Sequence, residues 1–193
     1  MVRYADDFVL GFQYRSDGLA FHAALNERLA EFGLCLHPDK TRLLEFGRFA
    51  ASNRKARGQG KPESFDFLGF THVCAVRRSD GRFTVRRLTI AARQRAILAR
   101  IRQWLMTNRC ILVCDQGRRI RQLLTGLIQY YGVPGNRRSL DAFRTEICRQ
   151  WCRALRRRGN KRPINWSATT RLIRQWVPSV RIVHPYPNQR FGV

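Results

Sequence analysis

Hydrophobic residues recur at helical spacing through the second half of the chain. Apolar residues three and four positions apart lie on one face of a helix, and residues 109–117 and 132–136 interrupt this pattern. The pattern therefore predicts three amphipathic helices that bury one another. Their apolar faces contain Ile97, Ile101, Trp104 and Leu105 in the first helix, Ile120, Leu123, Leu124, Leu127 and Tyr131 in the second, and Leu140, Phe143, Ile147, Trp151 and Leu155 in the third.

The first half opens with two short apolar runs separated by an acidic pair. Residues 2–12 place β-prone side chains on both sides of Asp6 and Asp7, which is typical of a hairpin. We expect both carboxylates at its tip.

A helical segment follows this hairpin. Apolar residues from Phe21 to Phe32 recur at helical spacing. Ser16 or Asp17 can serve as the N-cap, and Gly33 can end the helix. We expect an amphipathic helix with one buried face.

The rest of the first half alternates turns, loops and strands. Residues 37–40 predict a turn, 41–46 a returning strand and 52–64 a polar, basic loop. Residues 65–72 predict a further strand, and residues 73–85 a second hairpin. The predicted fold class is therefore α+β, with mixed structure followed by helices.

The charge of the chain is large and unevenly distributed. There are 37 Lys and Arg against 13 Asp and Glu, a formal net charge of +24. Residues 1–90 carry 15 basic and 10 acidic side chains (net +5), and residues 91–193 carry 22 and 3 (net +19). Such a polycation repels itself unless a polyanion neutralises it, so nucleic acid is the expected partner. A membrane surface is the weaker alternative, because the basic residues spread over several segments and loops.

Neither a membrane span nor a secretion signal is expected. No run of eighteen apolar residues occurs, and the acidic pair stands where the apolar region of a signal peptide would lie. The six cysteines then suit a cytoplasmic protein with free thiols. A zinc site at the pairs Cys110/Cys114 and Cys148/Cys152 is the alternative, but their position in apolar segments favours small core residues.

The acidic pair is the candidate for metal chemistry. Adjacent carboxylates at a bend repel each other unless a cation lies beside them. Mg²⁺ prefers oxygen ligands and substrate phosphates, so Asp6 and Asp7 suit part of a phosphoryl-transfer site. An ordinary acidic turn is the alternative.

Short motifs follow one another in a familiar order. Tyr-Ala-Asp-Asp occupies residues 4–7, His-Pro-Asp-Lys-Thr residues 37–41, and Phe-Leu-Gly-Phe residues 67–70. Basic and aromatic motifs follow at residues 151–158 and 184–191. The first three resemble the active-site, turn and primer-grip motifs of reverse transcriptases, and the last two resemble the maturase, or X, region of group II intron proteins.

This resemblance covers essentially the whole chain and implies a domain organisation. Residues 1–88 would form a partial reverse-transcriptase palm, with antiparallel hairpins, a helix and the primer grip. Residues 89–193 would form the thumb and maturase domain, a three-helix bundle with a small basic C-terminal unit.

The resemblance also implies roles for individual residues. Asp6 and Asp7 would be catalytic and would bind the two Mg²⁺ ions, with Asp6 as the principal ligand. The residues implied to lie near the nucleotide or primer are Tyr4, Ala5, Lys40, Phe67, Leu68 and Gly69. The glycine would let the backbone approach the primer. The alternative is a core position for the apolar residues of this set and a solvated turn for Lys40.

The motifs found in this sequence do not include every part of the family's active site. The family supplies another metal-binding aspartate from an earlier strand, together with fingers that cover the template, and both would precede Met1. The resemblance therefore implies an N-terminally truncated RNA-directed DNA polymerase that does not extend a primer alone. A separate N-terminal reverse-transcriptase fragment is accordingly a candidate partner.

The basic helical half is implied to hold a group II intron RNA and an RNA/DNA template-primer. Guanidinium groups bind phosphates and stack on bases. The candidate RNA-binding residues are Arg149, Arg153, Arg156, Arg157 and Arg158. The aromatic residues expected either to stack on unpaired bases or to form a C-terminal core are Trp166, Trp176, Tyr186 and Phe191.

Two other functions stay open from the sequence. The chain is either a polymerase part, as above, or a non-catalytic maturase remnant that helps an intron RNA fold. Another bacterial reverse transcriptase, such as a retron enzyme, is disfavoured by residues 184–191. No zinc-nuclease motif follows the maturase-like region, so homing endonuclease activity is not expected.

Overall fold

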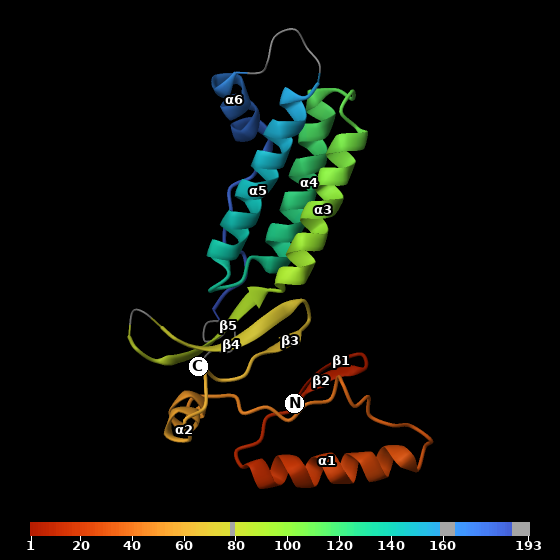
Figure 1. Ribbon diagram of the computed structural model, residues 1–193, viewed down its shortest axis with the longest axis vertical. Coiled ribbons are helices and arrows are strands. Elements are labelled where there is room, and N and C mark those ends of the chain that lie inside the picture. The colour runs from red at the N-terminus through yellow and green to blue at the C-terminus, as the bar shows by residue number, and fades with distance from the viewer. Residues whose placement is uncertain (78–79, 159–164, 187–193) are drawn as a thin grey trace.

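The computed structural model describes residues 1–77, 80–158 and 165–186. Two small antiparallel sheets and, within these ranges, six helices confirm the predicted α+β class. Helices α3 to α6 form a bundle at one end of the molecule, α1 and α2 lie at the other end, and the strands lie between them (Figure 1). No helix in the described ranges is long and apolar enough to cross a membrane.

The predicted N-terminal hairpin is confirmed. Strand β1 (Val2–Tyr4) pairs antiparallel with β2 (Asp7–Val9), and Tyr4 lies opposite Asp7. This register leaves Ala5 and Asp6 as a two-residue turn. The two strands form a sheet of their own, with no third strand paired to them in the described part of the chain.

Helix α1 (Arg15–Ala30) is followed by the predicted glycine stop. Gly33 has a φ of +67°, and its N–H donates to the carbonyl of Ala30 at 3.0 Å. The N–H of Leu34 donates to the carbonyl of Leu29 at 2.9 Å. These two bonds make the Schellman motif, which satisfies carbonyls at a helix end and needs a left-handed residue such as glycine.

The start of α1 and its burial differ from the predictions. The N-cap is Tyr14, without a side-chain cap hydrogen bond, so the predicted cap at Ser16 or Asp17 is wrong. Gly18 is the one buried residue of α1, and Phe21 is 39% exposed. All buried hydrophobic side chains of the described chain lie at residue 50 or beyond, so α1 covers no part of the core.

The segment after α1 contains the predicted turn but no strand. At the turn, the N–H of Thr41 donates to the carbonyl of His37 at 2.9 Å. The predicted strand over residues 41–46 is wrong, because no neighbouring strand pairs with this segment in the described chain. Its backbone takes a side-chain partner instead, since the N–H of Glu45 donates to the Glu63 carboxylate at 3.0 Å.

A short helix, α2 (Ala50–Ala56), replaces part of the predicted loop over residues 52–64. Its sequence contains three alanines together with Arg54 and Lys55, which are good helix formers. The helix is followed by Gly58, with a φ of +67°. The loop prediction therefore holds only after this point.

The second sheet has the order β3-β4-β5, with β3 (Phe65–Phe67), β4 (Phe70–Val76) and β5 (Phe83–Thr89) all antiparallel. The β4–β5 pairing confirms the predicted second hairpin. The single strand predicted over residues 65–72 is wrong, because Leu68 and Gly69 have φ values of +48° and +80°. A two-residue turn with both φ angles positive has the type I′ form, which joins adjacent antiparallel strands.

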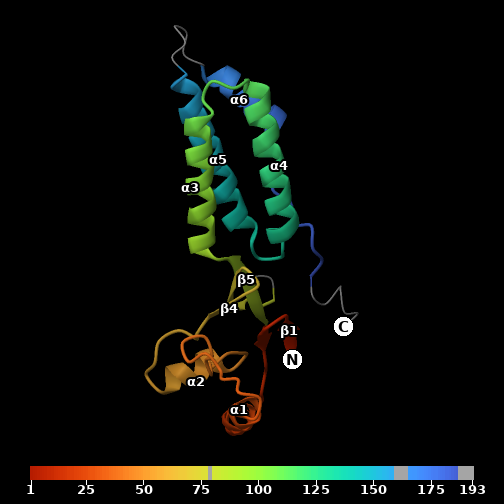
Figure 2. The same ribbon diagram turned by 90° about the vertical axis from the view of Figure 1, so that its right-hand side faces the viewer.

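The three predicted helices of the second half are confirmed as α3 (Ala91–Thr107), α4 (Val113–Tyr131) and α5 (Arg137–Arg156). Helix α3 packs against α5, and α4 packs against α5 and α6 (Figure 2). The break before α4 is shorter than the predicted 109–117, since α4 begins at Val113. The larger core cluster of the described chain lies among the helices of the bundle, and a second cluster joins Phe70 of β4 to Ile128 and Tyr131 of α4.

Helix α6 (Trp166–Trp176) was not predicted from the sequence. Its N-cap is Asn165, whose side chain accepts a hydrogen bond from the N–H of Ala168 at 2.9 Å. Trp176 lies directly on Gly117 of α4, where an added Cβ would come within 2.4 Å of the indole ring. The absence of a side chain at Gly117 therefore allows α6 to lie closely on α4.

Trp151 stands at the centre of the bundle core, with no exposed surface. Its Nε1–H donates to Oε1 of Gln116 at 3.0 Å, and Nε2 of Gln116 donates to the carbonyl of Asn108 at 2.8 Å. A buried polar group needs such partners to offset its loss of water. This chain of hydrogen bonds ties α5 to α4 and to the end of α3.

Asn136 joins the second sheet to the bundle. It is fully buried, and its Nδ2 donates to Oγ1 of Thr89 at 2.8 Å and to the carbonyl of Tyr131 at 2.9 Å. Its Oδ1 accepts from the N–H of Thr89 at 3.2 Å. One side chain thus holds the end of β5, the end of α4 and the start of α5, while Ile90 alone separates β5 from α3.

Candidate functional site

The acidic hairpin tip is open to solvent. Asp6 and Asp7 are exposed, and neither carboxylate has a hydrogen-bond or ion-pair partner within the described ranges. Ala5 has a φ of +54°, and Nε of Arg3 donates to its carbonyl at 2.9 Å. A non-glycine residue with positive φ costs roughly 1–2 kcal/mol, and such strain is concentrated at functional turns. Tyr4 and Asp7 share one face of the hairpin, because they are directly opposite each other.

The tip offers Mg²⁺ only part of a two-metal site. Its carboxylate oxygens are ligands of the type that Mg²⁺ prefers. Two metal ions about 4 Å apart require a larger set of ligands, and the described residues contain no group of three or more His, Cys, Asp or Glu placed to hold a metal. Asp6 and Asp7 therefore offer suitable ligand atoms but not a complete site, and no step of nucleotide transfer follows from them alone.

The residues implied to contact nucleotide or primer are spread over three turns. Tyr4 and Ala5 lie at the hairpin, with the Tyr4 side chain 65% exposed. Lys40 is exposed at the end of the turn that follows α1, and no side-chain partner is found for it in the described chain. Neither Tyr4 nor Lys40 belongs to the core, so the alternative of a core position does not apply to Tyr4.

The turn at Leu68 and Gly69 is docked on the end of α4. The hydroxyl of Tyr130 donates to the carbonyl of Leu68 at 2.8 Å. A Cβ at Gly69 would come within 3.1 Å of the Arg93 guanidinium and 3.3 Å of the Tyr131 hydroxyl. The positive φ of Gly69 and the approach of these side chains both favour glycine at this position. Contact with a primer stays a prediction.

Aromatic rings hold this turn in place. Phe70 stacks on Tyr130 at 5.8 Å between ring centroids and meets Tyr131 edge-on at 5.2 Å. Ring pairs of this geometry contribute roughly 0.5–1.5 kcal/mol beyond the burial of their surface. The contact made by Tyr130 was not predicted from the sequence. The pair of adjacent tyrosines at the end of a predicted helix was the signal that could have indicated it.

On the neighbouring strands, the ring centroids of Phe67 and His72 lie 6.5 Å apart. Burial lowers the pKa of His72 below its usual value.

The predicted RNA-binding arginines divide into two groups. Arg153, Arg156 and Arg157 are exposed without a side-chain partner in the described chain, and Arg149 forms an exposed ion pair with Glu146 at 3.6 Å. Arg158 points inward instead, where Nη2 donates to the carbonyl of Ile111. Its Nη1 is buried, so Arg158 joins α5 to the segment before α4.

The acidic residues of the helical half are already paired. Each one forms an ion pair with an arginine on its own helix: Asp115 with Arg118 at 2.9 Å, Asp141 with Arg137 at 3.7 Å, and Glu146 with Arg149 at 3.6 Å. These are the three Asp or Glu residues of positions 91–193. No carboxylate is therefore left to neutralise the other basic side chains of the bundle.

The prediction of small core residues holds for the pair Cys148/Cys152 but is wrong for Cys110, which is exposed, while Cys114 is partly buried. Cys148 belongs to the bundle core, and Cys152 is half-buried. Burial raises the pKa of both thiols. Since zinc binds the thiolate form, this environment disfavours metal binding at the pair.

The C-terminal aromatic residues differ in their surroundings. Trp176 packs on α4, with the guanidinium of Arg121 5.2 Å from its ring centroid. Trp166 is 72% exposed. Tyr186 is exposed, and Phe191 lies outside the described residues, as do positions 187–190 of the maturase-like motif. In the described part of that motif, Nε2 of His184 lies 2.7 Å from the carbonyl of Gln129.

The first part of the chain is similar to a known protein family. Residues 1–72, less than half of the chain, match the family model described as reverse transcriptase (RNA-dependent DNA polymerase). The matched range contains the acidic tip, the turn at residues 37–40 and the turn at Leu68 and Gly69. This match supports a reverse-transcriptase-like function at the level of the family. None of the curated proteins and none of the solved structures matches the chain.

Proposed function

We propose that the chain is part of a group II intron reverse transcriptase and maturase, and that its helical half binds the intron RNA and the RNA/DNA template-primer. The observation that carries this proposal is the charge of the bundle. Residues 91–193 have a net charge of +19, and the three acidic residues among them are paired with arginines. The reverse-transcriptase match of residues 1–72 supports RNA as the polyanion.

Helix α5 supplies the main binding face in this proposal. Arg153, Arg156 and Arg157 project from its last turns and have no competing partner in the described chain. Arginine donates several N–H groups in a planar fork and so binds phosphate oxygens in pairs. The opposite face of α5 is anchored by Trp151 in the core, so the arginines are presented from a rigid element. We expect the protein to act in a cytoplasmic ribonucleoprotein.

The affinity for structured RNA is expected to fall steeply with salt. Each phosphate contact releases condensed counterions, which gives a slope of roughly 0.7 to 0.9 in log Kd against log salt concentration. Contacts to six or more phosphates therefore lower affinity by about 10³-fold or more between 50 and 200 mM salt. Filter binding of a folded RNA across this range measures the slope. A flat response would contradict the proposal.

No primer extension is expected from this chain alone. Mg²⁺ supplies the Lewis acid of nucleotide transfer when two ions are bound, whereas Asp6 and Asp7 are the two carboxylates that the hairpin provides. The measurement is extension of a labelled primer on an RNA template with Mg²⁺ and deoxynucleotides, with an active reverse transcriptase as the positive control. Extension that disappears in an Asp6→Asn variant would show that the chain is an active polymerase by itself.

A non-catalytic maturase remnant is the second candidate function. It is favoured by the exposed position of the acidic tip, which has no third carboxylate beside it in the described ranges. The partner that would restore catalysis is a separate N-terminal reverse-transcriptase fragment with a further aspartate. Primer extension with such a fragment added separates the two functions, since only the polymerase part gains activity.

A further inference from the structure

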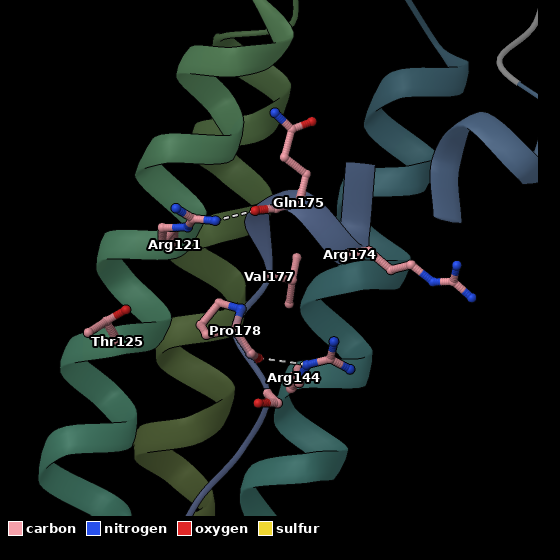
Figure 3. A pocket seen from close by; sticks show the side chains of 8 residues that line it. Arg121, Thr125, Arg144, Arg174, Gln175, Val177 and Pro178 are labelled. Carbon is pink, nitrogen blue, oxygen red and sulfur yellow. Dashed lines mark hydrogen bonds between the residues drawn. The ribbon is translucent and has the colours of Figure 1, made fainter. Parts of the chain in front are cut away.

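An open pocket of about 440 Å³ lies between α4, α5 and α6, at the point where the chain leaves α6 (Figure 3). Arginines of three different helices line it: Arg121 of α4, Arg144 of α5 and Arg174 of α6, whose long side chain extends outward from the pocket rim (Figure 3). Thr125 and Ser179 also line it. None of the five was a candidate from the sequence.

Two of these arginines are fixed by the backbone that follows α6. Nε of Arg144 donates to the carbonyl of Pro178 at 2.8 Å, and Nη2 of Arg121 donates to the carbonyl of Gln175 (Figure 3). Each guanidinium has five N–H donors, so these bonds hold its position and leave other donors available. Arg174 has no partner in the described part of the chain.

The charge around the pocket is not balanced by the protein. No Asp or Glu is among the described residues that line it, and the acidic residues of the bundle are paired with Arg118, Arg137 and Arg149. Like charges gathered at one cavity repel one another. An anion with several acceptor oxygens relieves this repulsion and accepts hydrogen bonds from the guanidinium and hydroxyl groups.

We propose that this pocket binds a phosphate group and, resting on the proposed function, that the phosphate belongs to the backbone of the bound RNA. The volume lies within the range of small-ligand sites, so a flanking ribose also has room. Val177 and Pro178 provide an apolar wall for it. The pocket would fix one point of the RNA on the side of the bundle formed by α4 and α6.

The test compares Arg174→Gln with Arg171→Gln in the full chain. Both arginines are exposed on α6 and lack partners in the described chain, but only Arg174 lines the pocket. Filter binding to a folded RNA is expected to weaken by about 5- to 10-fold at 0.1 M salt in Arg174→Gln, with the salt slope lower by roughly 0.7 to 0.9. Arg171→Gln is expected to change affinity by less than about twofold. Circular dichroism checks that both variants fold.

A second arm uses inorganic phosphate as the probe. The melting temperature is measured in sodium phosphate and in sodium chloride at equal ionic strength, for the original chain and Arg174→Gln. A rise specific to phosphate that is lost in the variant supports a site for free phosphate. An effect in the RNA arm alone assigns the site to a phosphodiester.

The outcomes separate the pocket from the proposed function. In the first case, the original chain binds RNA, but the two variants bind it equally well and phosphate has no specific effect on the melting temperature. This result would overturn the phosphate site in the pocket and leave the proposed RNA binding intact. In the second case, the chain binds no RNA and the proposed function fails. The melting experiment then tests the phosphate site by itself. A phosphate effect that is lost in Arg174→Gln supports the site, and the absence of any phosphate effect overturns it.

Discussion

Replacing Trp151 by alanine is expected to lower the free energy of unfolding by roughly 3–5 kcal/mol, the usual cost of truncating a buried aromatic residue. Trp151 has no exposed surface and contacts the core side chains of α3, α4 and α5. Its loss would leave a cavity and would also remove the donor that satisfies Gln116, whose side chain is itself buried. Urea unfolding followed by circular dichroism measures the change.

Trp166→Ala is the matched control for this substitution. Trp166 is 72% exposed in the first turn of α6, so its removal is expected to change the unfolding free energy by less than about 0.5 kcal/mol. A Trp151→Phe variant separates the hydrogen bond from the packing, because it keeps most of the volume. Equal destabilisation by Trp151→Ala and Trp166→Ala would show that the bundle core is not centred on Trp151.

Replacing Arg153, Arg156 and Arg157 together by glutamine is expected to weaken RNA binding by roughly two to three powers of ten at 0.1 M salt. Three lost phosphate contacts also lower the salt slope by roughly 2 to 3. The melting temperature is expected to stay nearly constant, since the three side chains are exposed. Filter binding at several salt concentrations measures both quantities.

A control with the same loss of charge tests whether the face or the total charge matters. Arg15, Lys55 and Lys61 are exposed basic residues of the first half, without side-chain partners in the described chain. Their joint replacement by glutamine is expected to weaken binding by less than about fivefold. An equal loss in the two triple variants would reject the α5 face and leave only a general attraction between the chain and RNA.

The helices of the second half were predictable because their apolar residues have partners within the same stretch of sequence. Ile101, Ile120 and Ile147 each lie on a periodic face, and these faces meet one another in one core. For α1, the same periodicity predicted the helix correctly but predicted a buried face that is largely exposed. Periodicity indicates a helix and a face, but it does not say what covers that face.

The hairpin was predictable for a different reason, since turn chemistry is local. The acidic pair between apolar runs was enough to place Asp6 in a turn. Pairing is not local, so the strand predicted over residues 41–46 failed where no neighbouring strand was present in the described chain. The turn at Leu68 that divides the predicted strand could not be seen in the sequence, because a positive φ is rare for leucine.

The candidate site was only partly predictable because side-chain direction depends on tertiary contacts. Arg157 and Arg158 are adjacent in sequence, yet the first is exposed and the second donates into the protein. The pocket of Arg121, Arg144 and Arg174 draws on helices far apart in sequence. Nothing in the spacing of these three arginines indicates that they meet.

The hydrogen bond between Tyr130 and the Leu68 carbonyl connects the turn to the C-terminal end of α4. Helix α6 contacts α4 at Gly117, near its N-terminal end. Nineteen residues span about 28 Å at the usual helical rise. Because Arg121 and Thr125 also belong to α4, one continuous helix carries both the contact with the Leu68 turn and part of the arginine pocket.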